Sequence, residues 1–281
     1  MTEYDGPVLD DHLHLDADNE GIDAVRDFER AGGTHLLIVN QPSWKLGVEV
    51  TEPTDTRPVF EATIDLVERA SDVLPGEAWP VLGVHPGLIS RLVERGLTPG
   101  EAGDLMRGCL EVAAEYAAEG PAIALKSGRP HYDVTDDVWD ASNAVIRHAL
   151  SLAAETGVAL QLHTEAAEDL SEIGSWAADA GLPAERVVKH YAGGTCSGVT
   201  PSVIARKEAL SEAAEVDEPF LMETDYLDDP ERPGAVLGPK TVPRRVTWLL
   251  EEGRTGAIRR AHVETPRRVY GIDTEGTLRE R

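Results

Sequence analysis

Short apolar stretches alternate along this chain with longer segments in which apolar residues recur every three or four positions. Stretches of the first kind are typical of buried parallel strands, and segments of the second kind are typical of amphipathic helices. Eight strands are predicted in this way, at residues 7–15, 35–41, 79–85, 122–127, 159–164, 186–191, 202–205 and 220–226. Their alternation with helical segments predicts repeated β–α units around a parallel sheet.

Helical periodicity fills most of the gaps, at residues 19–31, 58–73, 101–119, 136–156, 168–180, 207–215 and 239–252, and a last helix at 255–271 is broken by Pro266. Local signals support several boundaries, because Thr98 and Glu101 can form a capping box and Gly157 and Gly181 can end helices. The connection 192–201 (AGGTCSGVTP) is too short and too rich in glycine for a full helix. Either this unit is irregular or the seventh strand lies elsewhere.

Eight β–α units are what a closed (β/α)8 barrel, or TIM barrel, requires. The length of 281 residues suits one such barrel, which has about 250 residues in typical cases. Hydrophobic residues make up 41% of the chain, enough to bury a large core. Because no linker or low-complexity tract interrupts the pattern, we expect a single TIM-barrel domain over residues 1–281.

The chain is strongly acidic, with 51 Asp and Glu residues against 26 Lys and Arg residues and a net charge of −25. The acidic residues are spread through the predicted helices, and lysine is rare. This composition resembles that of proteins from salt-accumulating archaea. It argues against nonspecific binding to duplex nucleic acid, which requires a basic surface, although a nucleic-acid substrate stays open.

Cysteine usage and the N-terminal segment point to a cytoplasmic protein. Cys109 and Cys196 are far apart in the sequence and form no Cys-x-x-Cys motif, so neither a disulfide framework nor a thiolate zinc site is expected. The first ten residues lack the basic and apolar regions of a signal peptide. No stretch reaches the 18 or so apolar residues of a membrane span, and we expect no membrane association.

Two histidines in the first predicted strand are the first candidates for chemistry. His12 and His14 alternate with Leu13 and Leu15, and residues two apart in a strand share a face. Both imidazoles can therefore bind one ion. Alone the motif is weak, because pairs of histidines are also common on exposed strands.

Other candidate ligands end later strands. His163 ends the fifth predicted strand, His190 ends the sixth, and Asp225 lies at the end of the eighth. Because catalytic residues of a barrel come from the carboxyl ends of several strands, these side chains are expected to meet at one mouth. Imidazole and carboxylate ligands suit zinc, manganese, cobalt or iron, and magnesium is a further candidate. The set predicts one or two divalent metal ions.

Together with the sequences GVHP at 83–86, GRPHY at 128–132, METD at 222–225 and HVETPRRVYG at 262–271, these residues resemble a known family. The chain is similar to the amidohydrolase superfamily of metal-dependent hydrolases, and within it to the archaeal TatD-like branch, over nearly its whole length. The resemblance implies that His12, His14 and Asp225 hold one metal. It also implies that His163 and His190 hold a second metal and that a residue at the end of the fourth strand bridges the two.

The fourth strand departs from this pattern, because TatD-like proteins usually carry a glutamate where this chain has Lys126. Three interpretations compete. An unmodified ammonium would repel a metal unless its pKa were strongly lowered, which favours one metal or none. A lysine carboxylated by carbon dioxide, as occurs elsewhere in the superfamily, would restore a bridging carboxylate. Alternatively, the ammonium could bind a substrate anion. We favour the carboxylated lysine as a metal ligand.

Several further residues receive roles around this centre. Asp225 is our candidate general base, with a capping or salt-bridging role as the alternative. Glu223 lies deeper in the barrel and is expected to hydrogen-bond to a metal ligand or to the polar network of the core, and not to bind the metal itself. His85, Arg129 and His131 are predicted to bind substrate, with Arg129 gripping a phosphate or carboxylate through two N–H groups. Arg206 and Lys207 lie where barrels often bind phosphate; His35, His148 and His262 are expected to be structural.

These residues predict a hydrolase in which metal-activated water attacks a phosphoester or a carbonyl group, with Asp225 as general base. The resemblance implies cleavage of phosphodiesters in DNA, whereas Lys126 and the acidic surface leave room for small amides, lactones or phosphoesters. The alternatives are a small-molecule amidohydrolase or lactonase with a carboxylated Lys126, and a non-catalytic barrel with a degenerate metal site. The expected partner is thus a small-molecule or nucleic-acid substrate.

The acidic surface also predicts a stability that depends on salt. In dilute buffer the like charges repel one another, whereas in about 1 M salt the Debye length is only about 3 Å and the repulsion is screened. We therefore expect the melting temperature, measured by differential scanning calorimetry, to rise by several degrees between dilute buffer and molar KCl. An unchanged melting temperature would contradict this interpretation.

Overall fold

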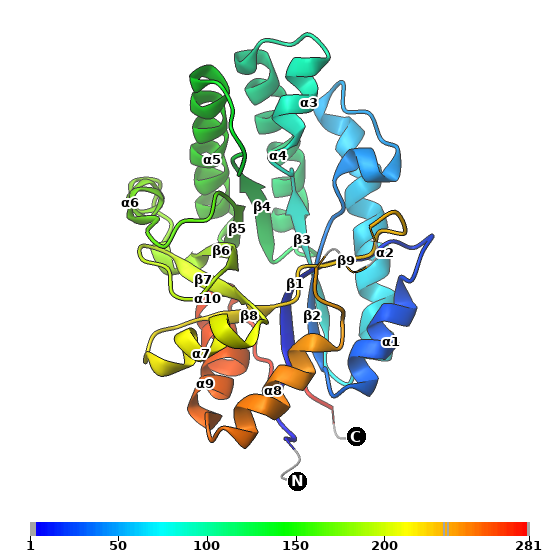
Figure 1. Ribbon diagram of the computed structural model, residues 1–281. Coiled ribbons are helices and arrows are strands. Elements are labelled where there is room, and N and C mark those ends of the chain that lie inside the picture. Colours follow the sequence, from blue (N-terminus) through cyan, green and yellow to red (C-terminus); the bar gives the residue numbers. More distant parts are fainter. Residues whose placement is uncertain (1–3, 233, 235, 280–281) are drawn as a thin grey trace.

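The computed structural model describes residues 4–232, 234 and 236–279, in which nine parallel strands form one curled sheet surrounded by helices (Figure 1). The strands are β1 Leu9–His14, β2 His35–Val39, β3 Ala78–Gly83, β4 Ala124–Gly128, β5 Ala159–His163, β6 Val187–Ala192, β7 Thr200–Ile204, β8 Leu221–Glu223 and β9 Tyr226–Leu227. The predicted parallel β/α barrel architecture is confirmed.

The sheet runs in the order β8-β7-β6-β5-β4-β3-β2-β1-β9. The last two strands belong to one short segment, 221–227, which the sequence predicted as a single strand. Leu221 to Glu223 pair with β7, whereas Tyr226 and Leu227 pair with β1. This segment therefore joins the two edges of the sheet and closes the barrel, with Thr224 and Asp225 at the junction.

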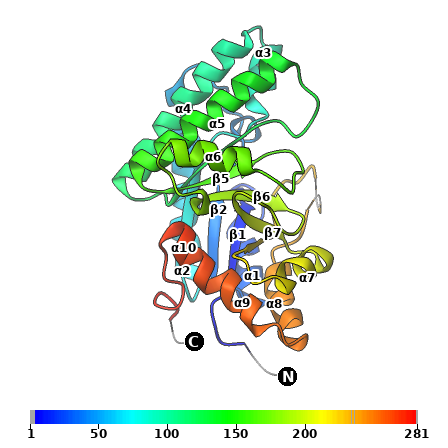
Figure 2. The ribbon, with the colours of Figure 1, turned by 90° about the vertical axis from the view of Figure 1, so that its left-hand side faces the viewer.

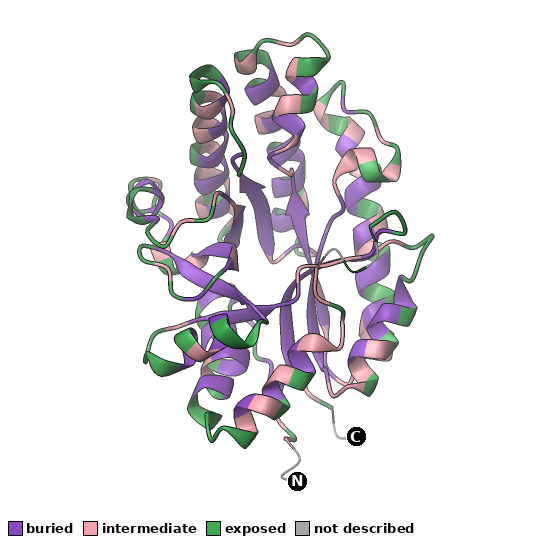
Figure 3. Ribbon diagram, viewed as in Figure 1, coloured by how far each residue is buried: buried purple, intermediate pink, exposed green. Residues whose placement is uncertain are grey.

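Helices cover the outside of the barrel, and their buried faces appear as purple stripes in Figure 3. They are α1 Ile22–Arg30, α2 Arg57–Val73, α3 Leu88–Glu94, α4 Pro99–Glu119, α5 Asp136–Thr156, α6 Ser171–Asp179, α7 Lys207–Glu215, α8 Thr241–Glu251, α9 Thr255–Arg259 and α10 Thr265–Tyr270. The predicted capping box of Thr98 and Glu101 is present at the start of α4, and Gly157 ends α5 in a left-handed conformation. Among the described residues, no helix combines the length and apolar character that a membrane span requires.

Two irregularities follow from glycine and proline. No helix lies between β6 and β7 in the described chain; instead Ser197 bridges to Asp169 in the loop after β5, so the unit predicted to be irregular is so. The predicted last helix contains a π-helical turn, Arg260–Glu264, just before Pro266. Proline lacks the N–H that an α-helix uses, and a widened turn accommodates this loss without ending the helical path.

The floor of the barrel is apolar and is closed by α10, which Figure 2 shows in red beside the strands. Val269 and Tyr270 of this helix pack against inward-facing residues of the strands, which include Leu9, Ala159 and Val188. The cluster is fully or almost fully removed from water. Polar side chains on the inner face are consequently confined to the layers above it, toward the carboxyl ends of the strands.

The three histidines expected to be structural lie away from those strand ends. His35 contacts Thr34 and Thr277 through its two ring nitrogens and stacks on Trp79. His262 accepts a hydrogen bond from the backbone N–H of Leu9, and His148 contacts Glu111 on the surface. The contacts of His35 and His262 tie the C-terminal region to the first two strands.

Burial of His35 makes the stability depend on pH. Burial lowers its pKa to about 4, whereas an unfolded histidine titrates near 6.5. Between these values the unfolded chain binds a proton that the folded protein does not, so stability is lost as the pH falls from about 6.5 to about 4. We expect the free energy of unfolding of His35→Gln to fall by about 2 kcal/mol less than that of the parent between pH 7 and pH 5. Urea unfolding in molar KCl measures both values. Equal losses in both proteins would refute this role.

Candidate metal centre

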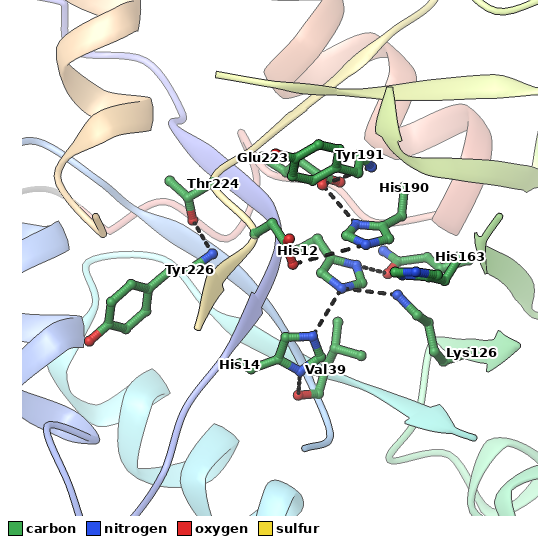
Figure 4. Close-up of polar contacts among 12 residues, drawn as sticks. His12, His14, Val39, Lys126, His163, His190, Tyr191, Glu223, Thr224 and Tyr226 are labelled. Carbon is green, nitrogen blue, oxygen red and sulfur yellow. Dashed lines mark hydrogen bonds and ion pairs between the residues drawn. The ribbon is translucent and has the colours of Figure 1, made fainter. Parts of the chain in front are cut away.

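The carboxyl ends of the strands bring six candidate ligands to one mouth of the barrel (Figure 4). They are His12 and His14 from β1, Lys126 from β4, His163 from β5, His190 from β6 and Asp225 from the β8–β9 junction. His12, His14, Lys126 and His190 are buried, while His163 and Asp225 are partly exposed. The sequence separations are large, so the barrel topology is what assembles this cluster.

Three of these imidazoles are fixed in the same tautomer. Each uses its Nδ1 to contact an oxygen: Gln161 Oε1 for His12 (2.7 Å), the carbonyl of Val39 for His14 (3.0 Å) and Glu223 Oε1 for His190 (2.8 Å). The first two can only accept a hydrogen bond, and the third accepts one as a carboxylate. Each Nδ1 therefore donates its hydrogen, and each Nε2 retains a lone pair. An outward Nε2 lone pair with an anchored Nδ1–H is the usual arrangement of a metal-binding histidine.

The free nitrogens converge. His12 Nε2 lies 3.3 Å from His14 Nε2, and a carboxylate oxygen of Asp225 lies within 4.8 Å of both rings' ligand atoms. Two nitrogens bound at about 2.05 Å to a tetrahedral ion would be about 3.3 Å apart. Two lone pairs at this distance repel each other unless a cation or a proton lies between them. The donor set and its spacing thus fit a divalent metal ion.

His190 belongs to the same cluster. Its ring stacks on that of His12 with centroids 3.8 Å apart, and its Nε2 lies 3.9 Å from Asp225 Oδ1. Glu223, which holds its Nδ1, is fully buried and also accepts the backbone N–H of Tyr191 at 2.9 Å. The other oxygen of Glu223, Oε2, has no hydrogen-bond partner among the described residues, which leaves it free for a cation or water.

Asp225 is held in an unusual backbone conformation. Its φ angle is 49°, in the left-handed region that non-glycine residues rarely adopt. The backbone N–H of Asp225 donates to the carbonyl of His12 at 3.0 Å, and the preceding Thr224 donates its N–H and its hydroxyl to Asp10. Such strain persists where the surroundings fix it, and it is common at functional sites. Burial raises the pKa of Asp225 to about 7.

Lys126 reaches the same nitrogen that a metal would use. Its Nζ lies 3.0 Å from His12 Nε2 and is almost completely buried. Burial lowers the pKa of Lys126 to about 7, which favours a neutral amine. A protonated Lys126 would donate to the lone pair of His12 and compete with a metal. A carboxylated Lys126 would instead present an oxygen ligand at this point.

The predicted substrate-binding residues lie around the mouth in three different settings. His85 accepts the backbone N–H of Gly87 on its Nδ1 at 3.0 Å, so a neutral His85 carries its hydrogen on Nε2 and is a donor. His131 is exposed, and its Nδ1 shares a hydrogen bond of 2.8 Å with His163 Nε2. A substrate-binding role for either residue stays a prediction.

Arg129 differs from the expected free guanidinium. It is buried, pairs with Glu165 through two nitrogens, donates to Asn143 at 2.9 Å and lies over the ring of Trp139. Glu165 follows β5 in the sequence, and only the folded barrel brings it to the loop after β4. Because these partners occupy its donors, Arg129 is positioned to fix the β4 and β5 loops; contact with a substrate would require it to exchange partners.

Basic residues after the seventh strand also contact neighbouring side chains. Arg206 donates to the hydroxyl of Tyr191 at 3.1 Å, and Lys207 lies over the ring of Trp248. Tyr191 has a φ of 56° and, with Asp225, is one of two described non-glycine residues with a positive φ. This conformation turns its N–H toward Glu223. The phosphate site expected at Arg206 and Lys207 stays a prediction.

Gln161 is the residue that the sequence did not single out. It faces the interior of β5 two positions before His163, and it is fully buried. Its Nε2 donates to the carbonyl of Asp11 at 3.0 Å and to the hydroxyl of Tyr270 at 2.9 Å, which orients its Oε1 toward His12. The sequence does offer one signal for Gln161: it is a polar residue two positions before His163, and residues two apart in a strand share a face.

We expect Gln161→Met to weaken metal binding about 10- to 100-fold, because His12 would lose the acceptor that fixes its tautomer. Competition with a chromophoric chelator measures this affinity. Ser127→Ala is the matched control, since Ser127 Oγ is buried and has no hydrogen-bond partner among the described residues, so its removal should leave metal affinity unchanged. Equal affinities of the Gln161 variant and the parent would remove Gln161 from this role.

Solved structures that resemble the fold include hydrolases with low sequence identity. A TatD-like protein from Archaeoglobus fulgidus has a TM-score of 0.57 and 17% identity, covering 94% of this chain and all of the other. A lactonase from Listeria monocytogenes has a TM-score of 0.57 and 14% identity, covering 94% of each chain. An organophosphorus hydrolase from Deinococcus radiodurans has a TM-score of 0.55 and 16% identity, covering 95% and 92%. At these identities the likeness concerns the fold.

Sequence comparison identifies closer relationships. An uncharacterized protein of Methanocaldococcus jannaschii is 32% identical over 283 residues, which span 96% of this chain and 97% of that one. The family model described as TatD related DNase matches residues 9–271, from β1 to the end of α10. The matched region contains every candidate ligand described above. The chain therefore belongs to the TatD related DNase family, whose metal-dependent hydrolase fold the structure shares.

Proposed function

We propose that this protein is a metal-dependent hydrolase of small esters, either phosphoesters or carboxylic esters such as lactones. The observation that carries the proposal is the convergence of His12 Nε2 and His14 Nε2, 3.3 Å apart, beside the carboxylate of Asp225. His190 Nε2 lies 3.9 Å from an oxygen of the same carboxylate. Membership of the TatD related DNase family supports hydrolysis as the reaction class.

His12, His14 and Asp225 would hold a divalent cation such as zinc, manganese, cobalt or iron, with the His190 ring beside them, stacked on that of His12. A cation bound there supplies Lewis acidity, which polarises a phosphoryl or carbonyl oxygen and lowers the pKa of water. The anchors of the imidazoles keep these nitrogens unprotonated. The histidine rings themselves therefore need no large rearrangement before they can bind metal.

Asp225 would act as the general base. Its side chain is 21% exposed, so one side faces the mouth from which water and substrate enter. The carboxylate lies beside the place where metal-bound water would be held, so it can accept a proton from attacking water and return it to the leaving group. The left-handed backbone of Asp225, held by His12 and Thr224, keeps the carboxylate aimed at the cluster.

His85 would contribute a hydrogen-bond donor to the substrate. Its Nε2–H is fixed by the contact of Nδ1 with Gly87, and its ring lies 4.8 Å from that of His163, centroid to centroid. A neutral donor suits an ester oxygen that becomes more negative during the reaction. Burial lowers the pKa of His85 to about 3, which keeps the ring neutral in this role.

Charge favours a small substrate over a nucleic acid. The chain carries a net charge of −25, and two cations near the mouth are paired with acids: Arg129 with Glu165 and Lys45 with Asp229. A long polyanion would therefore be repelled by the net charge of the protein. Cleavage of DNA is the second candidate function, and the description of the matching family favours it.

Turnover of a substrate panel by the metal-loaded protein tests the proposal. In molar KCl with cobalt, manganese or zinc, we expect hydrolysis of lactones or small phosphoesters and little cleavage of single-stranded DNA. Asp225→Asn should lower kcat about 100- to 10,000-fold because it removes the base, while circular dichroism shows an unchanged fold. Cleavage of DNA alone would favour the second function. If neither the parent nor Asp225→Asn turns over any substrate, a non-catalytic barrel is favoured.

We further propose that Lys126 is carboxylated in the active protein. With a pKa of about 7, much of the Lys126 amine is unprotonated near neutral pH and can attack carbon dioxide. The nitrogen then releases a proton, and the resulting carbamate would place a carboxylate beside His12 Nε2. We expect Lys126→Met to bind metal more weakly and to lose activity, and Lys126→Glu to retain both in part, because glutamate supplies a carboxylate directly. Labelling with ¹³C-bicarbonate should give a carbamate carbon signal that Lys126→Met lacks. The absence of this signal from the active parent would show that the lysine is unmodified.

A further inference from the structure

A buried carboxylate just after β9 fastens the end of that strand to the loop after β1. It belongs to Asp228, whose side chain is almost completely removed from water. Its Oδ2 accepts the backbone N–H groups of Asp16 at 2.9 Å and Gly21 at 2.8 Å. Its Oδ1 accepts the backbone N–H of Glu20 at 3.3 Å and a side-chain N–H of Asn19. Four donors from one loop therefore surround this carboxylate.

The loop after β1 is shaped to present these donors. Gly21 has a φ of 47°, and a Cβ there would lie 2.9 Å from the carbonyl oxygen of Asp16. Glycine thus permits the turn that directs this N–H to Asp228. The backbone N–H of Asp228 also donates to the carbonyl of His14 at 3.1 Å. Asp228 is consequently joined to the first strand and its loop through both its backbone and its side chain.

Asp225, three positions earlier, has the left-handed backbone that requires such support. A left-handed aspartate costs conformational free energy, so it persists only where contacts on both sides fix the chain. On one side, Thr224 is bound to Asp10 and its hydroxyl accepts the N–H of Tyr226 at 3.1 Å (Figure 4). On the other side, β9 has only two residues, so its pairing alone restrains the chain weakly. Asp228 is the strong restraint that follows.

We propose that Asp228 is a positioning residue of the metal centre. By fastening the end of β9 to the loop after β1, it holds Asp225 in the left-handed conformation and its carboxylate beside the β1 histidines. Without this anchor, the backbone at Asp225 relaxes to a negative φ and the carboxylate turns away. The proposal rests on the proposed function, because it assumes that Asp225 binds a metal together with His12 and His14.

The next residue supplies a matched control. Asp229 is also buried, but its carboxylate pairs with Lys45 of the loop after β2 at 2.6 Å and accepts the N–H of Glu231. The two neighbouring carboxylates therefore hold different parts of the mouth. Asp229→Asn removes one buried acid from the same segment and leaves the contacts of Asp228 in place.

The cobalt affinity of each variant, measured by competition with a chromophoric chelator, tests the proposal together with crystal structures of the metal-free proteins. Asp228→Asn keeps the shape of the side chain but turns an NH₂ group toward N–H donors. We expect it to lower the cobalt affinity about 10- to 100-fold and to make the φ of Asp225 negative. Asp229→Asn should keep the parent's affinity and its positive φ.

A milder variant covers the case in which Asp228→Asn does not fold. Asn19 lies on the exposed part of the loop, and Asn19→Ala removes one of the four donors to Asp228. We expect the cobalt affinity of Asn19→Ala to fall about 2- to 10-fold, as for the loss of one hydrogen bond. An affinity equal to that of the parent in this variant would count against the anchor.

The measurements separate this role from a merely structural one and from the proposed function. If Asp228→Asn lowers only the melting temperature, with cobalt affinity and the φ of Asp225 unchanged, the inference is overturned. Equal losses of affinity in Asp228→Asn and Asp229→Asn also overturn it, because the loss would then follow from charge alone. A parent that binds no cobalt overturns the proposed metal site, and the φ of Asp225 in metal-free Asp228→Asn then decides whether the anchor acts.

Discussion

The junction between the first and last strands is the constraint on which the rest of the site depends. Asp10 accepts two hydrogen bonds from Thr224, and the N–H of Asp225 donates to the carbonyl of His12. These contacts close the sheet, and they also set the distance between the β1 histidines and the carboxylate of Asp225. Barrel closure and ligand placement are therefore one event, and a change that loosens the seam would alter both.

Burial shapes the chemistry above this seam. In a low-dielectric interior a charged imidazole is costly, and burial lowers the pKa of His14 to about 3. Three acceptors then decide which nitrogen of each ring keeps its hydrogen: the amide oxygen of Gln161, the carbonyl of Val39 and the carboxylate of Glu223. The inner layer of polar side chains thus orients the rings, while the apolar floor beneath it supports the layer.

The barrel could be predicted from the sequence because most of its strands are continuous apolar runs that differ plainly from the amphipathic helices. The position of the candidate ligands followed from the same pattern, since His12, His14, His163, His190 and Asp225 all lie at strand ends. The split of the last strand into β8 and β9 did not follow, because it depends on pairing with both β7 and β1. Nor did the short helix α3, which no strong periodicity marked.

The partners of the side chains were harder to predict than their positions. Arg129 pairs with Glu165, and a contact between two loops cannot be read from either loop alone. The role of Gln161 depends on His12, which lies 149 positions away. The left-handed backbone of Asp225 is also hidden, since aspartate carries no sequence signal for it at the end of a strand. These features all arise from closure of the barrel and become visible only in three dimensions.

The wide separation between the first strand and its partners has a consequence for biosynthesis. The backbone of Leu9 is capped by His262, which is 253 positions away, and the edge of β1 pairs with Tyr226 and Leu227. While the chain emerges from the ribosome, the strand that carries His12 and His14 therefore waits with one edge unpaired until almost the whole protein has been made. Such an edge can pair with other chains. The nascent chain is therefore exposed to aggregation at this edge for most of its synthesis, and the candidate ligands come together only at the end of that process.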